Sequence, residues 1–227
     1  MMQLILGSSS ASRRQILSEM GYQFTVLSAD IDEDFRIEKP EELVAALAHE
    51  KAISIFPLTQ ELGSAIYLCK STSFLADAIL TKMVKNGMMQ DIVESQETTL
   101  LITADKVVIH DGVIRKKPTT PEGARKFIQG YSQSHASTIG SVVVTNVKSC
   151  VRMEGWDKSE VYFHKIPDEV IDSLIEEGSV FYVAGGLLVE HPLTSPLVES
   201  IVGTMDSVMG LPKELTEKLI KASLQEP

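Results

Sequence analysis

The feature that most constrains the fold lies at the start of the chain, where residues 4–17 predict a strand, a turn and a helix in immediate succession. A short apolar strand over residues 4–6 runs into Gly7 and three serines, and an amphipathic helix follows with Ile16, Leu17 and Met20 on its apolar face. A helix N-terminus carries partial positive charge and unpaired N–H donors. This order of elements therefore predicts a binding place for an anion such as phosphate.

The polar side chains of this turn suit the same ligand. Ser8 and Ser10 contribute hydroxyl groups, and Arg13 and Arg14 contribute guanidinium donors that match phosphate oxygens. The same residues also fit a surface helix with a serine cap and two solvated arginines, because serine is a favourable N-cap. From this stretch alone, the two interpretations remain equally supported.

Length and charge limit the possible functions. The chain has 227 residues, enough for one domain or two lobes that share a core, and a net charge of −10. This acidity argues against binding a nucleic-acid polymer, so a polyanionic substrate must meet a local basic cluster or metal ions. The two cysteines have no paired spacing, which is typical of a reducing compartment, and we expect a cytoplasmic protein. We expect no signal peptide and no membrane association, because no basic region precedes an apolar run and no such run is long enough to span a bilayer.

Four charged residues further along the chain are candidates for chemistry. Asp105 stands between two apolar runs, at a strand end where α/β sheets bind ligands, although an aspartate can also cap a turn there. Glu33, with Asp32 as a rival, lies in an acidic stretch that suits either Mg²⁺ or a solvated loop. Lys51 ends a helix predicted from residue 40 to residue 52, where a structural lysine is also expected. Lys117 closes a run of three basic residues that otherwise fits a solvated turn.

Together these motifs resemble the Maf (septum-formation protein) family of nucleoside triphosphate pyrophosphatases, in its eukaryotic-type branch. The family pattern Ala-Ser-x-Ser-Pro-Arg-Arg aligns with residues 7–13, with Ser8, Ser10 and Arg13 matching and Ser12 replacing the first arginine. Further matches are the family's Ala-x-x-Lys-Ala at residues 48–52, Ala-Asp at 104–105, Lys-Pro at 117–118 and Gly-Leu-Pro at 210–212. Residues 131–135 resemble Leu-Ser-Gly-x-x-His, with Tyr131 in place of leucine.

The segment from Val183 to Glu190 resembles the family's Ala-Gly-Ala-Tyr-x-Ile-Gln, whose glutamine lies near the nucleotide base. Paired glycines allow close backbone approach and suit a slot for a flat base. Glu190 replaces the glutamine, and an ionised glutamate only accepts hydrogen bonds. We therefore expect a guanine or 7-methylguanine base rather than uracil or thymine. Lys106 replaces the family's threonine or glutamine, where it either reaches a phosphate or faces solvent.

The resemblance implies an enzyme that cleaves the α–β phosphoanhydride of a nucleoside triphosphate to give monophosphate and pyrophosphate. It implies Mg²⁺ or Mn²⁺ held by Glu33 and Asp105, with Asp105 also taking a proton from the attacking water. Lys51 and Lys117 would stabilise the leaving pyrophosphate. The departures leave open a regulatory nucleotide-binding protein that has lost hydrolysis. An unrelated phosphotransferase is a weaker alternative, because no P-loop motif is present.

The expected fold is α/β, with an elongated mixed central sheet flanked by helices and two lobes around a cleft, similar to inosine triphosphatases. The resemblance implies a single domain over residues 1–227 and a homodimer. It does not cover residues 57–98, which we expect to be a helical insertion serving as a lid, an arm or a dimer element. Its predicted apolar stripe consists of Phe74, Ala78, Ile79 and Met83. Near the C-terminus we expect a strand over residues 201–209.

Overall fold

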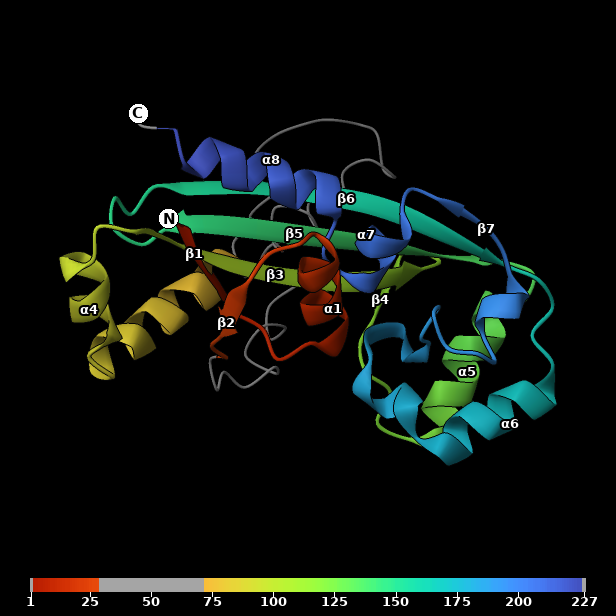
Figure 1. Cartoon of the computed structure of the whole chain (residues 1–227). Coiled ribbons are helices and arrows are strands. Elements are labelled where there is room, and N and C mark those ends of the chain that lie inside the picture. The colour runs from red at the N-terminus through yellow and green to blue at the C-terminus, as the bar shows by residue number, and fades with distance from the viewer. Residues whose placement is uncertain (1, 29–71, 226–227) are drawn as a thin grey trace, which may run out of the picture. The chain divides into compact units, whose positions relative to one another are not determined.

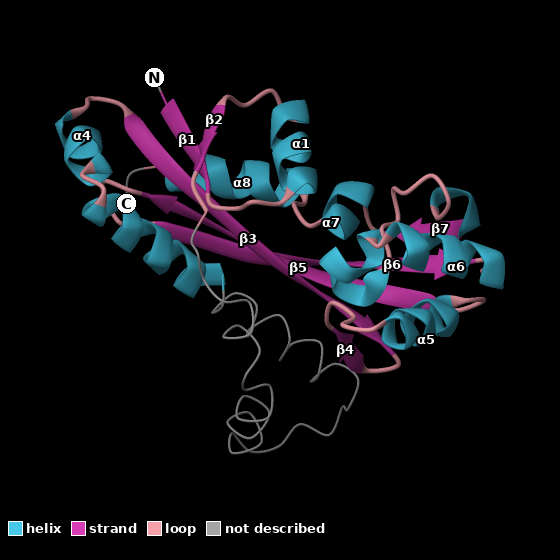
Figure 2. Ribbon diagram, turned by 90° about the horizontal axis from the view of Figure 1, so that it is seen from below, coloured by secondary structure: helices cyan, strands magenta, loops and turns pink. Residues whose placement is uncertain are grey.

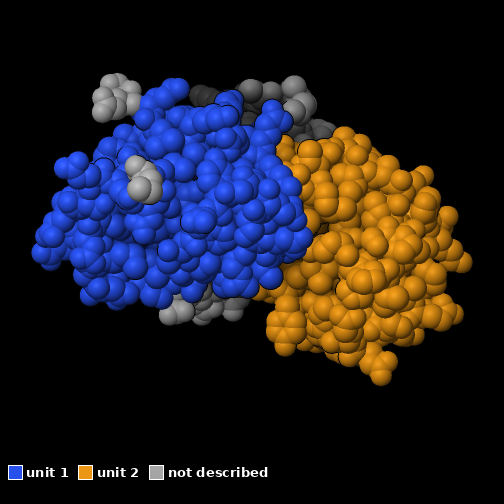
Figure 3. All heavy atoms as spheres, in the orientation of Figure 1, with its two compact units in different colours: residues 1–105, 141–156, 210–227 blue, residues 106–140, 157–209 orange. Residues whose placement is uncertain are grey.

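The computed structural model describes residues 2–28 and 72–225. The predicted acidic stretch with Glu33 and the predicted helix with Lys51 lie outside these residues. The chain forms two compact units (Figure 3). Unit 1 comprises Met1–Asp105, Ser141–Trp156 and Gly210–Pro227, and unit 2 comprises Lys106–Gly140 and Asp157–Met209.

Within the described residues, one mixed sheet of seven strands is the framework of the protein (Figure 1). Its strands are β1 (Met2–Leu6), β2 (Phe24–Val26), β3 (Thr98–His110), β4 (Val113–Arg115), β5 (His135–Asn146), β6 (Arg152–Phe163) and β7 (Val198–Val202). The order is β2-β1-β3-β5-β6-β7, and β4 pairs with β3. β1 is parallel to both of its neighbours, whereas the β3–β4 and β6–β7 pairs are antiparallel. The predicted α/β class with a mixed sheet is confirmed.

The helices of the described residues flank the sheet. They are α1 (Ala11–Glu19), an unlabelled helix over residues 72–85, α4 (Met88–Glu94), α5 (Pro121–Tyr131), α6 (Asp168–Glu177), α7 (Met205–Met209) and α8 (Lys213–Ser223). Short 3₁₀ turns follow α6, namely η2 (Ser179–Tyr182), η3 (Ala184–Gly186) and η4 (Ser195–Leu197). In the part of the chain that the structure describes, no helix has the length and apolar character needed to cross a membrane.

In unit 1, helices pack on both faces of the sheet (Figure 2). Side chains alternate between the faces of a strand, so Ile5 and Leu101 point to the same side and pack against the helix over residues 72–85 and against α4. Helices α1 and α8 lie on the opposite side in Figure 2. The core of unit 1 therefore forms around β1, which carries the turn at Gly7 at its carboxyl end.

The predicted apolar stripe of the helix over residues 72–85 is partly wrong. Ile79 and Met83 are fully buried as expected, but Phe74 is 51% exposed and Ala78 is only half-buried. Leu75 and Ala76 occupy the core, together with Ile79 and Met83. Both sets of positions fit a helical period, and the sheet residues on which the helix packs decide which set is buried. That residues 57–98 form an insertion remains a prediction.

In unit 2, α5 and α6 pack on one face of the sheet and form a second core. Sheet residues Val108, Val161 and Phe163 contact residues of these helices, among them Ala124, Ile128, Tyr131, Ile171 and Leu174. Thr120 caps the start of α5, because its side chain accepts a hydrogen bond from the Gly123 N–H at 3.1 Å. A hairpin turn joins β3 and β4, with positive φ at Asp111 (48°) and Gly112 (71°).

The strand predicted over residues 201–209 is wrong in its extent. The strand β7 ends at Val202, and residues 205–209 form the short helix α7. Gly203 adopts φ 112°, which ends the strand. Thr204 then accepts a hydrogen bond from the Ser207 N–H at 3.3 Å, as an N-cap does. The apolar residues of this segment fit both a strand and a single helical turn, so the sequence pattern could not separate them.

Candidate active site

The turn between β1 and α1 is held by its own serines. The Ser10 side chain caps α1 by accepting a hydrogen bond from the Arg13 N–H at 3.4 Å. The Ser8 hydroxyl, which is 8% exposed, accepts from the Ser10 N–H at 3.2 Å. Because both hydroxyl oxygens act as acceptors, each O–H group can donate to an anion at the helix N-terminus.

Arg13 ties this turn to the C-terminal part of unit 1. Its Nε donates to the Gly210 carbonyl oxygen at 3.0 Å, and one terminal nitrogen donates to the Ser8 hydroxyl at 3.2 Å. A planar guanidinium can make both bonds at once, which an ammonium cannot do with the same geometry. Arg14, by contrast, is exposed on the surface of α1. The two neighbouring arginines therefore have different environments, and Arg13 is the one that orders the turn.

Gly7 allows the turn to lie close to β3 and to the helix over residues 72–85. Its N–H donates to the Ile102 carbonyl oxygen at 2.7 Å. A Cβ atom at this position would overlap with Ile79 Cδ1 and would lie 2.7 Å from Thr103 Cγ2. A methyl group here would force the side chains of Ile79 and Thr103 to shift, so packing rather than backbone angles favours glycine at this position.

Asp105 lies inside β3, three residues beyond the carbonyl that anchors Gly7, so the expected position at a strand end is wrong. At a strand rise of about 3.3 Å per residue, it lies about 10 Å along the strand from that anchor. It is half-buried and directly follows Ala104, which is fully buried. The described residues contain no group of three metal-ligating side chains. Mg²⁺ is, however, commonly held by one or two carboxylates together with substrate phosphates, so a site built on Asp105 fits this ion.

The basic run of residues 115–117 begins at the end of β4 and contacts the loop over residues 183–190 in unit 2. Lys117 is exposed and Pro118 is buried. The Lys116 carbonyl oxygen accepts a hydrogen bond from the Gly185 N–H at 3.2 Å. The Arg115 guanidinium lies over the Phe127 ring, 4.8 Å from its centroid, which is a cation–π contact. Lys117 is therefore presented to solvent on a segment whose neighbours are fixed in place.

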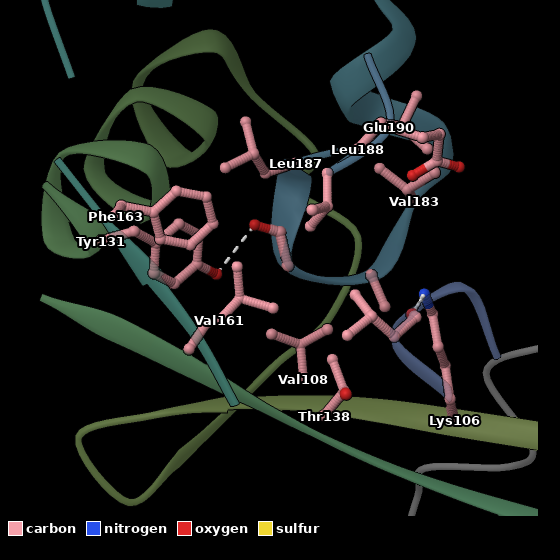
Figure 4. A pocket seen from close by; sticks show the side chains of 15 residues that line it. Lys106, Val108, Tyr131, Thr138, Val161, Phe163, Val183, Leu187, Leu188 and Glu190 are labelled. Carbon is pink, nitrogen blue, oxygen red and sulfur yellow. Dashed lines mark hydrogen bonds between the residues drawn. The ribbon is translucent and has the colours of Figure 1, made fainter. Parts of the chain in front are cut away.

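Unit 2 contains a pocket beneath the loop over residues 183–190 (Figure 4). Strands β3, β5 and β6, Tyr131 at the end of α5, the segment 183–190 and Val208 line about 480 Å³ of open space. Most of the lining side chains are apolar, and the polar ones are Lys106, Tyr131, Thr138 and Glu190. Glu190 is exposed, so its carboxylate lies at the rim rather than in the interior. Figure 4 shows this carboxylate on the part of the loop beyond Leu187 and Leu188.

The two glycines expected to form a slot adopt conformations that favour glycine. Gly185 has φ 78° and Gly186 has φ 70°. A Cβ on Gly185 would lie 2.8 Å from Val108 Cγ1, and a Cβ on Gly186 would lie 3.2 Å from Pro118 Cγ. The loop therefore packs directly on β3 and on the Lys-Pro segment.

Lys106 also faces this pocket. Its ammonium group donates to the Val208 carbonyl oxygen at 2.6 Å, at the end of α7 (Figure 4). Of the two roles expected from the sequence, solvent exposure is wrong, because the side chain is half-buried and lines the pocket. His135, whose ring stacks on Tyr162 with centroids 5.1 Å apart, accepts a hydrogen bond through its carbonyl oxygen from His110 Nδ1 at 2.8 Å.

The sequence relationships agree with these motifs. A family model described as "Maf-like protein" matches residues 3–223. The chain belongs to the Maf family. A protein of Dictyostelium discoideum named 7-methyl-GTP pyrophosphatase is 35% identical over 218 residues, which cover 96% of this chain and 95% of the relative. Two proteins named dTTP/UTP pyrophosphatase are each 28% identical, from Halalkalibacterium halodurans (96% of this chain, 94% of the relative) and from Thermotoga maritima (93% and 84%).

Two contacts of this Maf protein were not expected from the sequence. Arg13 binds Gly210 across most of the chain length, and Tyr131 binds Gly185 within the pocket of unit 2. The signal for the first contact is the Gly-Leu-Pro motif at residues 210–212, which matches the family pattern but does not indicate which residue Gly210 contacts. The second had a weaker signal, the tyrosine at a position where the motif has leucine.

Proposed function

We propose that this Maf protein hydrolyses a nucleoside triphosphate to the monophosphate and pyrophosphate. The observation that carries the proposal is the anion-binding turn of Ser8, Ser10 and Arg13 on the same unit as Asp105, in a chain aligned over almost its whole length with relatives named pyrophosphatases. Basic groups alone would make a binding site. A carboxylate on the same unit supplies the base that hydrolysis needs.

Each proposed residue has a separate role in the reaction. The triphosphate binds through the hydroxyl groups of Ser8 and Ser10 and the N–H groups at the start of α1, with Arg13 and Arg14 adding positive charge. Asp105 takes a proton from a water molecule, whose oxygen forms a bond to the α-phosphorus. The bond from that phosphorus to the bridging oxygen breaks, and pyrophosphate leaves with its negative charge stabilised by Lys51 and Lys117.

We further propose that Asp105 and Glu33 hold a divalent ion, either Mg²⁺ or Mn²⁺. Carboxylate oxygens are the ligands that these hard ions prefer, and the half-buried Asp105 has the right chemistry for one such ligand. When bound, the ion neutralises phosphate charge. In a protein with a net charge of −10, such neutralisation favours binding of a polyanionic substrate.

The substrate base is proposed to be guanine or 7-methylguanine. Glu190 lines the pocket of unit 2, and its carboxylate can accept hydrogen bonds from the N1–H and amino groups of guanine. Uracil and thymine present mainly carbonyl acceptors, which a carboxylate repels. The name of the Dictyostelium relative agrees with this choice. We also expect a cytoplasmic homodimer.

The experiment that tests this function is pyrophosphate release from a panel of nucleoside triphosphates. The panel contains GTP, 7-methyl-GTP, UTP and dTTP, each with Mg²⁺, with Mn²⁺ and with chelator. We expect metal-dependent release that is fastest with a guanine-type base. The same assay on Asp105→Asn should show turnover lower by a factor of about 10² to 10⁴, as expected for loss of a general base.

Melting temperature and circular dichroism provide the control for Asp105→Asn, because a single half-buried carboxylate does not build the core. Undiminished turnover in this variant would remove Asp105 from the mechanism. Nucleotide binding by the wild-type protein without pyrophosphate release from any member of the panel would instead identify a regulatory nucleotide-binding protein.

A further inference from the structure

We propose that Tyr131 is a positioning residue that fixes the carbonyl group of Gly185 and thereby determines how well the pocket discriminates between bases. This inference rests on the proposed function and assigns a role to a residue outside the expected catalytic set. Tyr131 contributes no group to the phosphate chemistry. It acts through the loop from Val183 to Glu190, which carries the carboxylate proposed to recognise the base.

The first argument is the contact itself. The Tyr131 hydroxyl donates to the Gly185 carbonyl oxygen at 2.8 Å, and Figure 4 shows this bond inside the pocket. The tyrosine is 1% exposed. Its ring stacks on Phe163 with centroids 6.0 Å apart and meets the edge of His110 at 5.2 Å. The ring is therefore fixed on two sides, and its hydroxyl is a rigid donor.

The second argument is that the loop needs such a donor. Gly185 and Gly186 both have positive φ, and consecutive glycines have little intrinsic preference for one backbone conformation. Gly185 is held from both sides, at its N–H by the Lys116 carbonyl at 3.2 Å and at its carbonyl by Tyr131. Removing the hydroxyl leaves one of these two anchors and a buried carbonyl group without its donor.

The third argument concerns what the loop carries. Leu187, Leu188, Val189 and Glu190 follow the two glycines directly and line the same pocket. A change in the backbone at Gly185 therefore moves the Glu190 carboxylate relative to the pocket. The turn from Ser8 to Arg13 belongs to unit 1, and the bonds from Ser10 and Arg13 to Ser8, from Arg13 to Ser10 and from Arg13 to Gly210 all join groups of that unit. Loss of the tyrosine hydroxyl should therefore affect recognition of the base and spare recognition of the phosphates.

The hydroxyl also keeps its proton under all ordinary conditions. Burial raises the pKa of Tyr131, and the opposing effect of the Arg115 charge is smaller. The phenol is therefore a neutral donor across the pH range in which the enzyme can be assayed. The ratio of KM between a Tyr131→Phe variant and the wild-type protein should consequently be the same at pH 6 and at pH 9.

The test is Tyr131→Phe, with Tyr162→Phe as the matched control. Tyr162 donates its hydroxyl to Glu160 at 2.7 Å and does not line the pocket, so its variant loses the same group elsewhere in unit 2. In Tyr131→Phe, we expect KM for the preferred guanine-type nucleotide to rise roughly three- to tenfold, as expected for one lost hydrogen bond. The ratio of kcat/KM between that nucleotide and UTP should fall by the same factor.

Two further readouts separate positioning from a general loss of structure. Inhibition by inorganic tripolyphosphate, which has no base, should be unchanged in Tyr131→Phe, and kcat should change less than twofold. Amide hydrogen exchange in residues 183–190 should be faster than in the wild-type protein, with little change in β1 and α1. Tyr162→Phe should resemble the wild-type protein in its base ratio and in the exchange of residues 183–190.

The proposal is overturned if a folded Tyr131→Phe protein has the same ratio of kcat/KM between the guanine-type nucleotide and UTP as the wild-type protein. An equal loss for all nucleotides together with weaker tripolyphosphate inhibition also overturns it, because the effect would then be one of global stability. If the wild-type protein releases no pyrophosphate, the proposed function fails independently. The same ratio is then measured from nucleotide dissociation constants, so Tyr131 is still tested.

Discussion

Two glycine-containing turns of this protein, the one over residues 7–14 in unit 1 and the loop over residues 183–190 in unit 2, are held in place in different ways. The serines of the first turn bond to groups two and three residues away along the chain. The second loop is held by Tyr131, which is 54 residues away from Gly185, and by the carbonyl of Lys116. The serines of the first turn shape it locally, and bonds from Gly7 to Ile102 and from Arg13 to Gly210 anchor it. The bonds that anchor Gly185 in the second loop come from distant residues.

This difference matches the two tasks that we propose. A triphosphate is the same in every nucleotide, so the turn that binds it can be a local and rigid anion site. The base is the part that varies, and the loop that reads it combines flexible glycines with support from a neighbouring helix. We therefore expect damage to the turn to affect all nucleotides equally and damage to the loop to change the choice among them.

Among changes to the two turns, the largest expected effect comes from Arg13→Met. This change removes the bonds to the Ser8 hydroxyl and to the Gly210 carbonyl, together with a positive charge at the phosphate site. Hydrogen bonds from charged groups contribute about 1.5 to 3 kcal/mol each, so kcat/KM should fall about a hundredfold or more. Steady-state kinetics with GTP, 7-methyl-GTP and UTP should show the same factor for each.

Arg14→Met is the matched comparison, because it removes the same side chain from the next position. Since Arg14 is exposed, the fall in kcat/KM should be smaller, about three- to tenfold. A base-dependent effect of Arg13→Met, or a larger effect at Arg14, would contradict the assignment of the turn to the phosphates.

A smaller and selective effect is expected from Glu190→Gln. The amide offers donors as well as an acceptor, so it can pair with the carbonyl groups of uracil and thymine. The preference should shift by about tenfold toward UTP and dTTP, with little change in tripolyphosphate inhibition. Competition between 7-methyl-GTP and UTP in one reaction measures this shift directly. An unaltered preference would show that Glu190 does not contact the base.

The smallest effect on activity, with a measurable effect on stability, is expected from Gly7→Ala. The added methyl group overlaps with Ile79 Cδ1 and presses on Thr103, which should lower the free energy of unfolding by about 1 to 2 kcal/mol. Ile79→Val removes the overlapping atom, so the double variant should be more stable than the sum of the two single changes implies. Urea unfolding of the four proteins gives this coupling energy. Simple additivity would mean that Ile79 does not limit the space at Gly7.

Local patterns in the sequence predicted much of the fold because local interactions produce it. The strand, turn and helix at residues 4–17, the Thr120 cap and the hairpin at residues 111–112 all depend on groups a few positions apart. The same holds for the turn over residues 7–14, where the Ser10 hydroxyl caps the helix that follows. Family membership also came from the sequence, through motifs in a fixed order.

Only the tertiary structure decided the features that depend on distant partners. The sequence fitted both stripes of the helix over residues 72–85, and contact with Ile5 and Leu101 buried Leu75 rather than Phe74. From the sequence, the tyrosine at position 131 was only part of a family motif, and the tertiary structure places its hydroxyl against the Gly185 carbonyl. The periodic pattern of a sequence indicates which face of a helix or strand a side chain lies on. Which residue that side chain contacts depends on how distant elements pack against each other in the fold.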